Sequence, residues 1–312
     1  MRPLLLLPCC ALLACVSVPE FDDPEIVDRP RALAIVAEPP EVAPGQPVDL
    51  SVMLAAPPGQ SPLDYRVRWS VCGTFLGEIM GSQYETGPQD RGCGPDAESF
   101  GDGTQVRLPG EVSAALFANL EVASAIFGSL LPEGTVEAIK TEVGLPLLVE
   151  ATVEADDRVL RAVKRVIING GGRGHHNPPP PHFDFDDREI IADDRRPFLC
   201  RAADAGPVRW PAGTEVELAP RLVPGEDDPE LEFWLESYPV LNARGELEER
   251  DEKAFYSWFS TGGEFEQGVT ESPLRNEIWR TPDRTGPTPL WLVVRDGHGG
   301  TSACELEVEL TP

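Results

Sequence analysis

The chain has few basic residues, which excludes several classes of partner. It carries 26 Lys and Arg against 53 Asp and Glu, a formal charge of −27, and only Lys140, Lys164 and Lys253 are lysines. A protein that binds nucleic acid needs clustered Lys and Arg on its surface, and so does one that docks on anionic lipid. We therefore expect no nucleic-acid partner. The excess of acid is typical of a solvated surface, with binding of a divalent cation as the alternative.

The sequence also lacks the motifs of common catalytic sites. It has no Gly-x-Ser-x-Gly elbow, no His-Glu-x-x-His pair and no glycine-rich phosphate loop. Asp296 and His298, in the stretch RDGHGG, could form an acid–base couple. Because Asp-Gly and Gly-Gly after a long apolar run are typical of a turn, we interpret this stretch as a connection between strands. We predict that the protein is not an enzyme.

No apolar run is long enough to cross a bilayer. The longest, LLLLPCCALLA, has about eleven residues, whereas a spanning helix needs about 20. It follows Arg2, as the apolar region of a signal peptide follows a positive residue, and predicts a signal peptide over residues 1–14.

The end of this run resembles the lipobox of bacterial lipoproteins. Residues 12–15 read Leu-Leu-Ala-Cys, a large aliphatic residue three positions before the cysteine and a small one directly before it. The resemblance implies that Cys15 is acylated and becomes the first residue of the mature chain, held on a membrane by its lipid. Residues 15–30 would then be a polar tether. The alternative is an ordinary secretory signal cut nearby. Val16 replaces the Asp that retains many lipoproteins in the inner membrane, which favours the outer membrane.

The cysteines downstream of the anchor suggest disulfides. Cys72, Cys93, Cys200 and Cys304 allow three pairings, and an exported protein can form them. One bridge in each of two domains, Cys72 with Cys93 and Cys200 with Cys304, is the simplest choice. No Cys-x-x-Cys spacing points to a zinc site.

The patterning from residue 31 onward predicts two all-β domains. In YRVRWSVC, alternate residues are apolar, and Cys304, Leu306, Val308 and Leu310 alternate with glutamates in the same way. The stretch RALAIVAEPPEVAPGQPVDLSVMLA, followed by Trp-Ser and a cysteine, resembles the opening of immunoglobulin-like modules in bacterial exported proteins, such as the lipoproteins of myxobacteria. WFSTGGEF and PLWLVVRDGHGG are similar to the last strands of such modules, which are also likened to cadherin and PKD repeats. The resemblance implies two immunoglobulin-like β-sandwiches in tandem, over residues 31–169 and 184–312.

Two stretches interrupt the strand pattern. Residues 110–131 place Val112, Leu116, Leu120, Ala123 and Phe127 at helical spacing, which predicts an amphipathic helix inserted in the first sandwich. Residues 170–183 contain GGGRGHHNPPPPH, the composition of a linker between domains. His175, His176 and His182 lie in it. We expect a solvated linker, with weak capture of nickel or zinc as the alternative.

Two further types of site are open alternatives. An acidic cluster follows the linker, and calcium sites at junctions of cadherin-type modules use such carboxylates. Its candidate ligands are Asp184, Asp186, Asp187, Asp193 and Asp194. The Trp residues of the second half could stack on sugar rings if they lined up outside a sheet. We expect a non-catalytic envelope lipoprotein that binds a protein or polysaccharide, with a carbohydrate-binding or calcium-binding accessory protein, or an exported hydrolase, as the alternatives.

Overall fold

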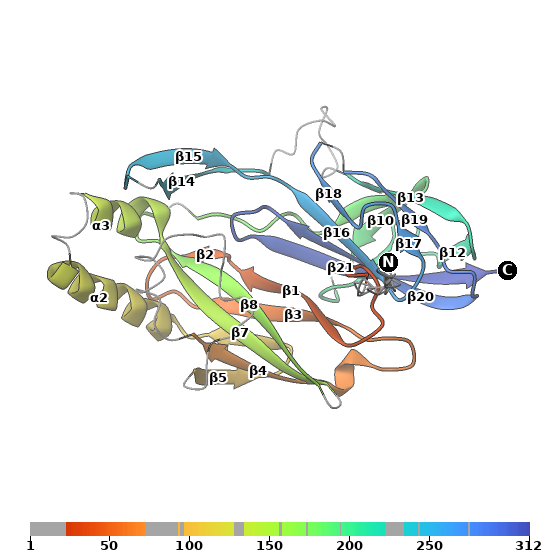
Figure 1. The fold of residues 1–312 in the computed structure, drawn as a ribbon, viewed down its shortest axis with the longest axis horizontal. Helices are drawn as coiled ribbons and strands as arrows, with labels where there is room; N and C mark the ends of the chain where they lie inside the picture. Colours follow the sequence, from red (N-terminus) through yellow and green to blue (C-terminus); the bar gives the residue numbers. More distant parts are fainter. Residues whose placement is uncertain are drawn as a thin grey trace, which may run out of the picture.

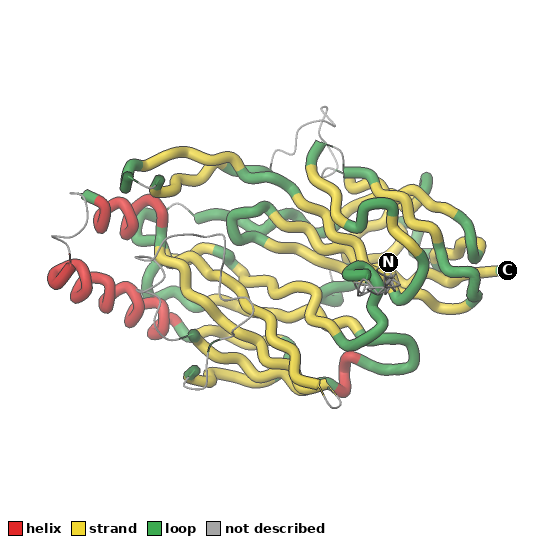
Figure 2. The backbone as a smooth tube through the Cα atoms, in the orientation of Figure 1, coloured by secondary structure: helices red, strands yellow, loops and turns green. Residues whose placement is uncertain are grey.

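Two β-sandwiches lie side by side and account for most of the chain (Figures 1 and 2). A computed structural model describes residues 23–72, 93, 97–127, 134–155, 158–172, 174–193, 195–221, 234–242, 244–273 and 275–312. The signal peptide and Cys15 lie outside these residues, as does Asp194. The prediction of two immunoglobulin-like sandwiches with a helical insertion is confirmed.

The first sandwich packs a sheet of order β1-β3-β6 on a sheet of order β2-β8-β7-β4-β5. The strands are β1 (Arg31–Glu38), β2 (Glu41–Val42), β3 (Val48–Ala55), β4 (Arg66–Val71), β5 (Glu98–Asp102), β6 (Gln105–Leu108), β7 (Leu145–Ala155) and β8 (Arg158–Ile168). A short 3-10 helix, η1 (Pro62–Asp64), precedes β4. The fully buried Trp69 fills the space between the sheets, and Arg66 and Arg68 on the same strand are exposed. The two-residue alternation of β4 is therefore what the sequence predicts.

The helical insertion connects β6 to β7 at one end of the molecule (Figure 2). It comprises α2 (Gly110–Phe127) and α3 (Thr135–Ala138), which continues into a π-helical turn, η4 (Ile139–Val143). Val112, Leu116 and Leu120 pack against the first core, which confirms the predicted apolar face over these turns. Residues 128–131 of the predicted helix lie outside the described residues. None of the described helices is both long and apolar enough to cross a membrane.

The second sandwich has a larger sheet than the first and shares one type of strand pairing with it. Its sheets have the orders β11-β10-β9-β13-β19-β17 and β12-β21-β20-β16-β18. In both sandwiches an early strand pairs in parallel with the last strand, β2 with β8 and β12 with β21. The strands are β9 (His182–Phe185), β10 (Arg188–Ala192), β11 (Cys200–Ala202), β12 (Val208–Pro211), β13 (Glu215–Pro220), β16 (Phe255–Ser260), β17 (Glu264–Phe265), β18 (Val269–Glu271), β19 (Glu277–Arg280), β20 (Gly286–Arg295) and β21 (Thr301–Thr311).

The two disulfides have the predicted pairing. Cys200 on β11 bonds Cys304 on β21, with 5.5 Å between the Cα atoms, and both residues belong to the second core. Cys72 bonds Cys93 in the first sandwich. In β21, Leu306, Val308 and Leu310 point into the core and alternate with less buried glutamates. Because successive side chains of a strand face opposite ways, this alternation also places the thiol of Cys304 inside.

A third apolar cluster joins the two sandwiches. It contains Val27, Leu33, Ala34, Met53 and Ala55 on one side and Trp291, Val293 and Ala303 on the other. The outer face of the β1-β3-β6 sheet is thus covered by β20 and β21. β3 alternates between buried and less buried residues over its first half only, because Met53, Leu54 and Ala55 are all buried. The second sandwich supplies the burial that the local pattern does not show.

A hairpin of the second sandwich also reaches the first. Strands β14 (Ser237–Leu241) and β15 (Leu247–Asp251) form a separate two-stranded sheet that runs towards the helical insertion (Figure 1). β14 contacts η4, and Leu241 packs against the first core. The hairpin therefore bridges the two sandwiches on the side opposite to β4 and β5.

Residues 23–30 do not behave as the free tether that their composition predicts. Ile26 forms a parallel bridge with Ser260, and the backbone N–H of Val27 donates to the carbonyl of Ser260 at 2.7 Å. Val27 is fully buried in the cluster between the sandwiches. Backbone pairing and burial of one apolar residue fix this segment against β16, so any free tether ends before it.

Candidate functional site

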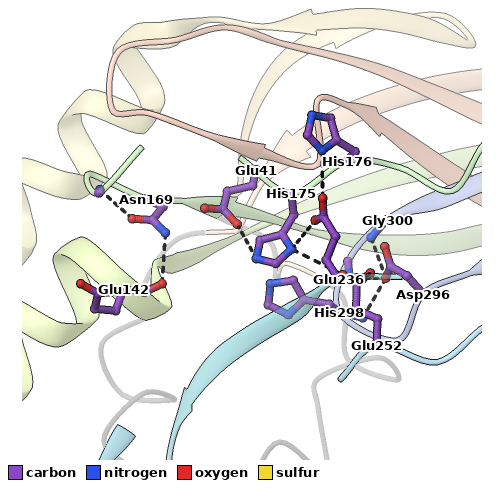
Figure 3. A network of polar contacts seen from close by, with 12 residues as sticks. Glu41, Glu142, Asn169, His175, His176, Glu236, Glu252, Asp296, His298 and Gly300 are labelled. Carbon is purple, nitrogen blue, oxygen red and sulfur yellow. Dashed lines mark hydrogen bonds and ion pairs between the residues drawn. The ribbon is translucent and has the colours of Figure 1, made fainter. Parts of the chain in front are cut away.

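Several charged and aromatic side chains meet between the two sandwiches (Figure 3). We name Glu41, His175, Glu236, Glu252 and His298 the interdomain cluster. Each comes from a different segment: β2, the connection between the sandwiches, the two ends of the β14–β15 hairpin, and the β20–β21 turn.

His175 lies at the centre of the interdomain cluster. Its Nε2 is 3.7 Å from Oε2 of Glu41, and its Nδ1 is 2.8 Å from Oε2 of Glu236 and 3.5 Å from Oε1 of Glu252. Glu41, His175 and Glu252 are buried, with 5%, 8% and 4% of their surface exposed. Figure 3 shows the imidazole between Glu41 on one side and the hairpin glutamates on the other.

The expectation of a solvated linker around the histidines is wrong for His175. The neighbouring His176 is exposed and contacts the other oxygen of Glu236, at 3.1 Å. The hairpin glutamates and β2 nevertheless enclose the inner residue, so His175 has the fixed surroundings that the Gly/Pro composition does not reveal.

The connection itself is packed between the sandwiches. Asn177 donates to the carbonyl of Ala37 at 2.7 Å and accepts from the N–H of Thr301 at 2.8 Å. The hydroxyl of Ser302 donates to the carbonyl of Pro179 at 2.9 Å. These bonds attach the connection to β1 on one side and to β21 on the other. His182, the third histidine of the stretch, opens β9 and contacts Glu189 at 2.9 Å, away from the interdomain cluster.

Asp296 and His298 form the turn that the sequence predicts. Oδ1 of Asp296 accepts hydrogen bonds from the N–H groups of His298, Gly299 and Gly300, at 2.8, 2.8 and 3.0 Å. Oδ1 of Asp296 is therefore bound in the turn, whereas the buried Oδ2 makes no hydrogen bond within the described part of the chain. The turn points the imidazole of His298 at His175, with 4.5 Å between the ring centroids, and stacks it on Tyr238 at 3.9 Å.

Two basic residues of β8, Lys164 and Arg165, bind this turn. Nζ of Lys164 donates to the carbonyl of Gly299 at 2.5 Å and to the hydroxyl of Thr301 at 2.9 Å, and Arg165 donates to the carbonyl of His298 at 2.8 Å. Burial lowers the pKa of Lys164 to about 7. These bonds attach the first sandwich to the turn through its backbone.

Burial shifts the pKa values of several residues of the interdomain cluster. It raises the pKa of Glu41 and that of Glu252 above their ordinary values, although the charge of His175 opposes both shifts. Burial alone would lower the pKa of His175, but its contact with Glu252 and the charges of Glu41 and Glu236 outweigh this, and the pKa is raised. Burial and the charges of His175 and Arg165 lower the pKa of His298 to about 3, so its imidazole is neutral at pH 7.

Two sets of donor atoms in the interdomain cluster converge closely enough to hold a metal ion. One set is Glu41, His175 and His298, and the other is His175, Glu236 and Glu252; in each set the atoms lie within 4.8 Å of one another. Oε1 of Glu41, Nδ1 of His175 and Oε1 of Glu252 are buried and make no hydrogen bond. The groups of the interdomain cluster are carboxylates and imidazoles, which are common ligands of divalent cations.

The predicted calcium ligands do not converge in the same way. Asp184 pairs with Arg221, and Asp193 accepts from Arg196 at 3.0 Å. Asp186 and Asp187 are exposed between β9 and β10. Among the described residues, none of these carboxylates belongs to a converging donor set. Calcium binding here stays a prediction, and Asp194 lies outside the described residues.

The tryptophans do not form an exposed strip. All six lie within the described residues, and none is exposed. Trp258 and Trp279 are fully buried in the second core, and Trp291 lies in the cluster between the sandwiches. These tryptophans fill the apolar cores, and the stacking platform of a sugar-binding module is not formed by them.

No protein-family model and no curated protein matches the chain. Among solved structures it is similar to the native alpha-2-macroglobulin of E. coli, at 12% identity over 93% of this chain and 17% of that one, with a TM-score of 0.25. It is also similar to the D0–D1 domain of intimin, at 10% identity over 90% of this chain and 99% of that one, with a TM-score of 0.21. The chain spans less than a quarter of the macroglobulin, and similarities at this level carry no statement about function.

Proposed function

We propose that the protein is a non-catalytic interaction module of the bacterial cell envelope, held on the outer membrane by lipid on Cys15. Its two sandwiches form one body that presents a strongly acidic surface to an envelope protein or polysaccharide. The lipobox resemblance supports the anchor.

The observation that carries the proposal is the buried disulfide of the second sandwich. Cys304 has 1% of its surface exposed, and its bond to Cys200 closes a sequence separation of 104 residues. Structural disulfides form in oxidising compartments, and in bacteria these lie outside the cytoplasmic membrane. An exported chain with a cysteine at a lipobox is the combination that a lipoprotein requires.

Binding is favoured over catalysis by where the polar groups lie. Glu41, His175 and Glu252 are buried in the interdomain cluster. Asp296, the acid that the sequence places beside His298, accepts backbone N–H groups through Oδ1, which fixes it in the turn. These groups stabilise the contact between the sandwiches, and the exposed outer faces of the sheets are suited to recognition.

Crosslinking on intact cells tests this role. A chain with a C-terminal tag, treated with a short amine-reactive or carboxyl-reactive crosslinker and purified under denaturing conditions, should carry a saturable envelope component. The matched control is Cys15→Ser, which removes the lipid and leaves the described sandwiches unchanged. The proposal is wrong if the wild-type chain carries no component beyond those crosslinked to the Cys15→Ser chain.

A further inference from the structure

We propose that a divalent transition-metal ion of the zinc class binds between the two sandwiches, with Glu41, His175 and His298 as its protein ligands. The proposal concerns the interdomain cluster only and does not depend on the envelope role.

The first argument is the convergence of the three donors. Each residue offers one ligand atom, and the three atoms lie within 4.8 Å of one another. Nε2 of His175 is 3.7 Å from Oε2 of Glu41. Ligands about 2.0 to 2.2 Å from a tetrahedral zinc ion lie about 3.3 to 3.6 Å from one another, so small side-chain movements bring these atoms into place.

The second argument is a buried oxygen without a partner. Oε1 of Glu41 makes no hydrogen bond, although Glu41 has only 5% of its surface exposed. Buried polar atoms are nearly always hydrogen-bonded, and an unpaired carboxylate oxygen is among the most unfavourable exceptions. A cation beside His175 and His298 would satisfy this oxygen directly.

The third argument is the surroundings of Nδ1 of His175, the ring nitrogen that faces away from Glu41. Its Nδ1 faces Oε2 of Glu236 at 2.8 Å and Oε1 of Glu252 at 3.5 Å. A histidine that ligates a metal through one nitrogen usually donates its other N–H to a carboxylate, which fixes the ring and its tautomer. Nδ1 of His175 lies 2.8 Å from Oε2 of Glu236 without making a hydrogen bond. A small rotation of the ring would let its N–H donate to Glu236, so Glu236 and Glu252 would act as positioning residues that leave Nε2 of His175 free to ligate.

This arrangement favours Glu41, His175 and His298 over the other converging set. An ion held by His175, Glu236 and Glu252 would use Nδ1 and would pair the buried Oε1 of Glu252, but it would leave the unpaired oxygen of Glu41 and the ring of His298 without a role. The chosen set uses all five residues of the interdomain cluster, three as ligands and two as positioning residues.

The ligand types indicate the metal. Calcium and magnesium take six or more oxygen ligands, whereas two imidazoles with one carboxylate suit zinc and its neighbours in the first transition row. Water can fill a fourth position. Glu41 belongs to the first sandwich, His298 to the second and His175 to the connection. The ion would therefore clamp the two sandwiches together, and its role would be structural.

Metal titration of the full chain tests the proposal. The chain is purified in detergent, treated with a chelator, dialysed, and titrated with zinc chloride in a calorimeter. We expect one ion per chain. At a free zinc concentration about 100 times the Kd, the midpoint of thermal unfolding should rise by about 4 °C. Cobalt(II) chloride, as a second probe, should give visible absorption bands that report direct ligation.

Single substitutions identify the ligands. Glu41→Gln keeps the size of the side chain and removes its charge, and His298→Asn removes the second imidazole; each should weaken zinc binding at least 100-fold and change the cobalt spectrum. Glu236→Gln should weaken binding by about 10-fold to 100-fold, as expected for a positioning residue. His176→Ala is the matched control, since this exposed histidine lies next to His175 and should leave the affinity unchanged within twofold.

Three results would overturn the assignment. The first is no saturable binding of zinc by the wild-type chain. The second is a loss of binding in His176→Ala as large as that in His298→Asn. The third is loss of binding in Glu252→Gln with full binding in Glu41→Gln and His298→Asn. Far-ultraviolet circular dichroism of each variant shows whether it is folded, and the near-isosteric Glu41→Gln keeps the test decisive if a histidine variant does not fold.

Discussion

The two disulfides should contribute unequally to stability, because they close loops of different length. Their sequence separations are 104 residues for Cys200–Cys304 and 21 residues for Cys72–Cys93. The chain-entropy relation then gives about 4.7 and about 3.3 kcal/mol at 25 °C, a difference of about 1.4 kcal/mol. At an unfolding entropy of about 2.1 cal/mol/K per residue and about 290 residues that unfold in one transition, removal of the Cys200–Cys304 bond lowers the midpoint of unfolding by about 8 °C and removal of the Cys72–Cys93 bond by about 5 °C.

Differential scanning calorimetry of two double variants measures this difference. One variant carries Cys200→Ala and Cys304→Ala, and the other carries Cys72→Ala and Cys93→Ala, so each loses the same chemical groups. Wild-type chain treated with a reductant is the control and should lose both contributions. A midpoint that falls further in the Cys72/Cys93 variant than in the Cys200/Cys304 variant would refute the loop-length argument.

Three other contacts give predictions of their own. Trp291→Ala opens the apolar cluster between the sandwiches, so it should lower the free energy of unfolding by about 3 to 5 kcal/mol in urea and split a single melting transition into two; one unchanged transition would contradict this. Asp296→Ala leaves three backbone N–H groups unpaired and should cost about 3 kcal/mol in the same assay, whereas Asp296→Asn, which keeps an accepting oxygen, should cost clearly less. Burial and the neighbouring Asp23 raise the pKa of Glu25 to about 7, so docking of residues 23–30 is strongest below pH 4.5 and weakens as the pH rises through 7. Hydrogen exchange of the Val27 amide, corrected for its intrinsic rate, should therefore lose protection between pH 5 and 8 in the wild type and not in Glu25→Gln.

The elements built from local alternation are predictable from the sequence. In β21, apolar residues and glutamates alternate over most of the strand, and this places Cys304 in the core beside Cys200. The helical spacing after Gly110 likewise predicts α2, because an amphipathic helix requires only residues that are near in sequence.

The contact between the sandwiches is not predictable in this way. Met53 and Ala55 are buried by β20 and β21, which lie more than 200 residues further along the chain. A residue such as Val27, in a polar and proline-bearing stretch, gives no local indication that it fills this contact. Tertiary packing decides the burial of these residues, and single-sequence patterns do not report it.

The interdomain cluster could not be predicted from the sequence for the same reason. Its five residues come from five segments. Only His175 and His298 lie in stretches whose composition is unusual, GGGRGHHNPPPPH and RDGHGG. The Gly/Pro composition around His175 is typical of a solvated linker, and it hides the fact that two glutamates of a distant hairpin enclose the ring. The scarcity of histidine is the one signal that could have pointed here, since two of the four histidines of the chain meet at this place.

The proposed lipid on Cys15 gives the N-terminal peptide a definite mass, which can be measured. The protein is extracted from membranes of the native or a related bacterium and digested with a protease that cuts after acidic residues. We predict a peptide that begins at Cys15 and carries the mass of a diacylglyceryl group together with an N-linked acyl chain. A peptide that begins after residue 15, or one with an unmodified Cys15, would contradict the claim.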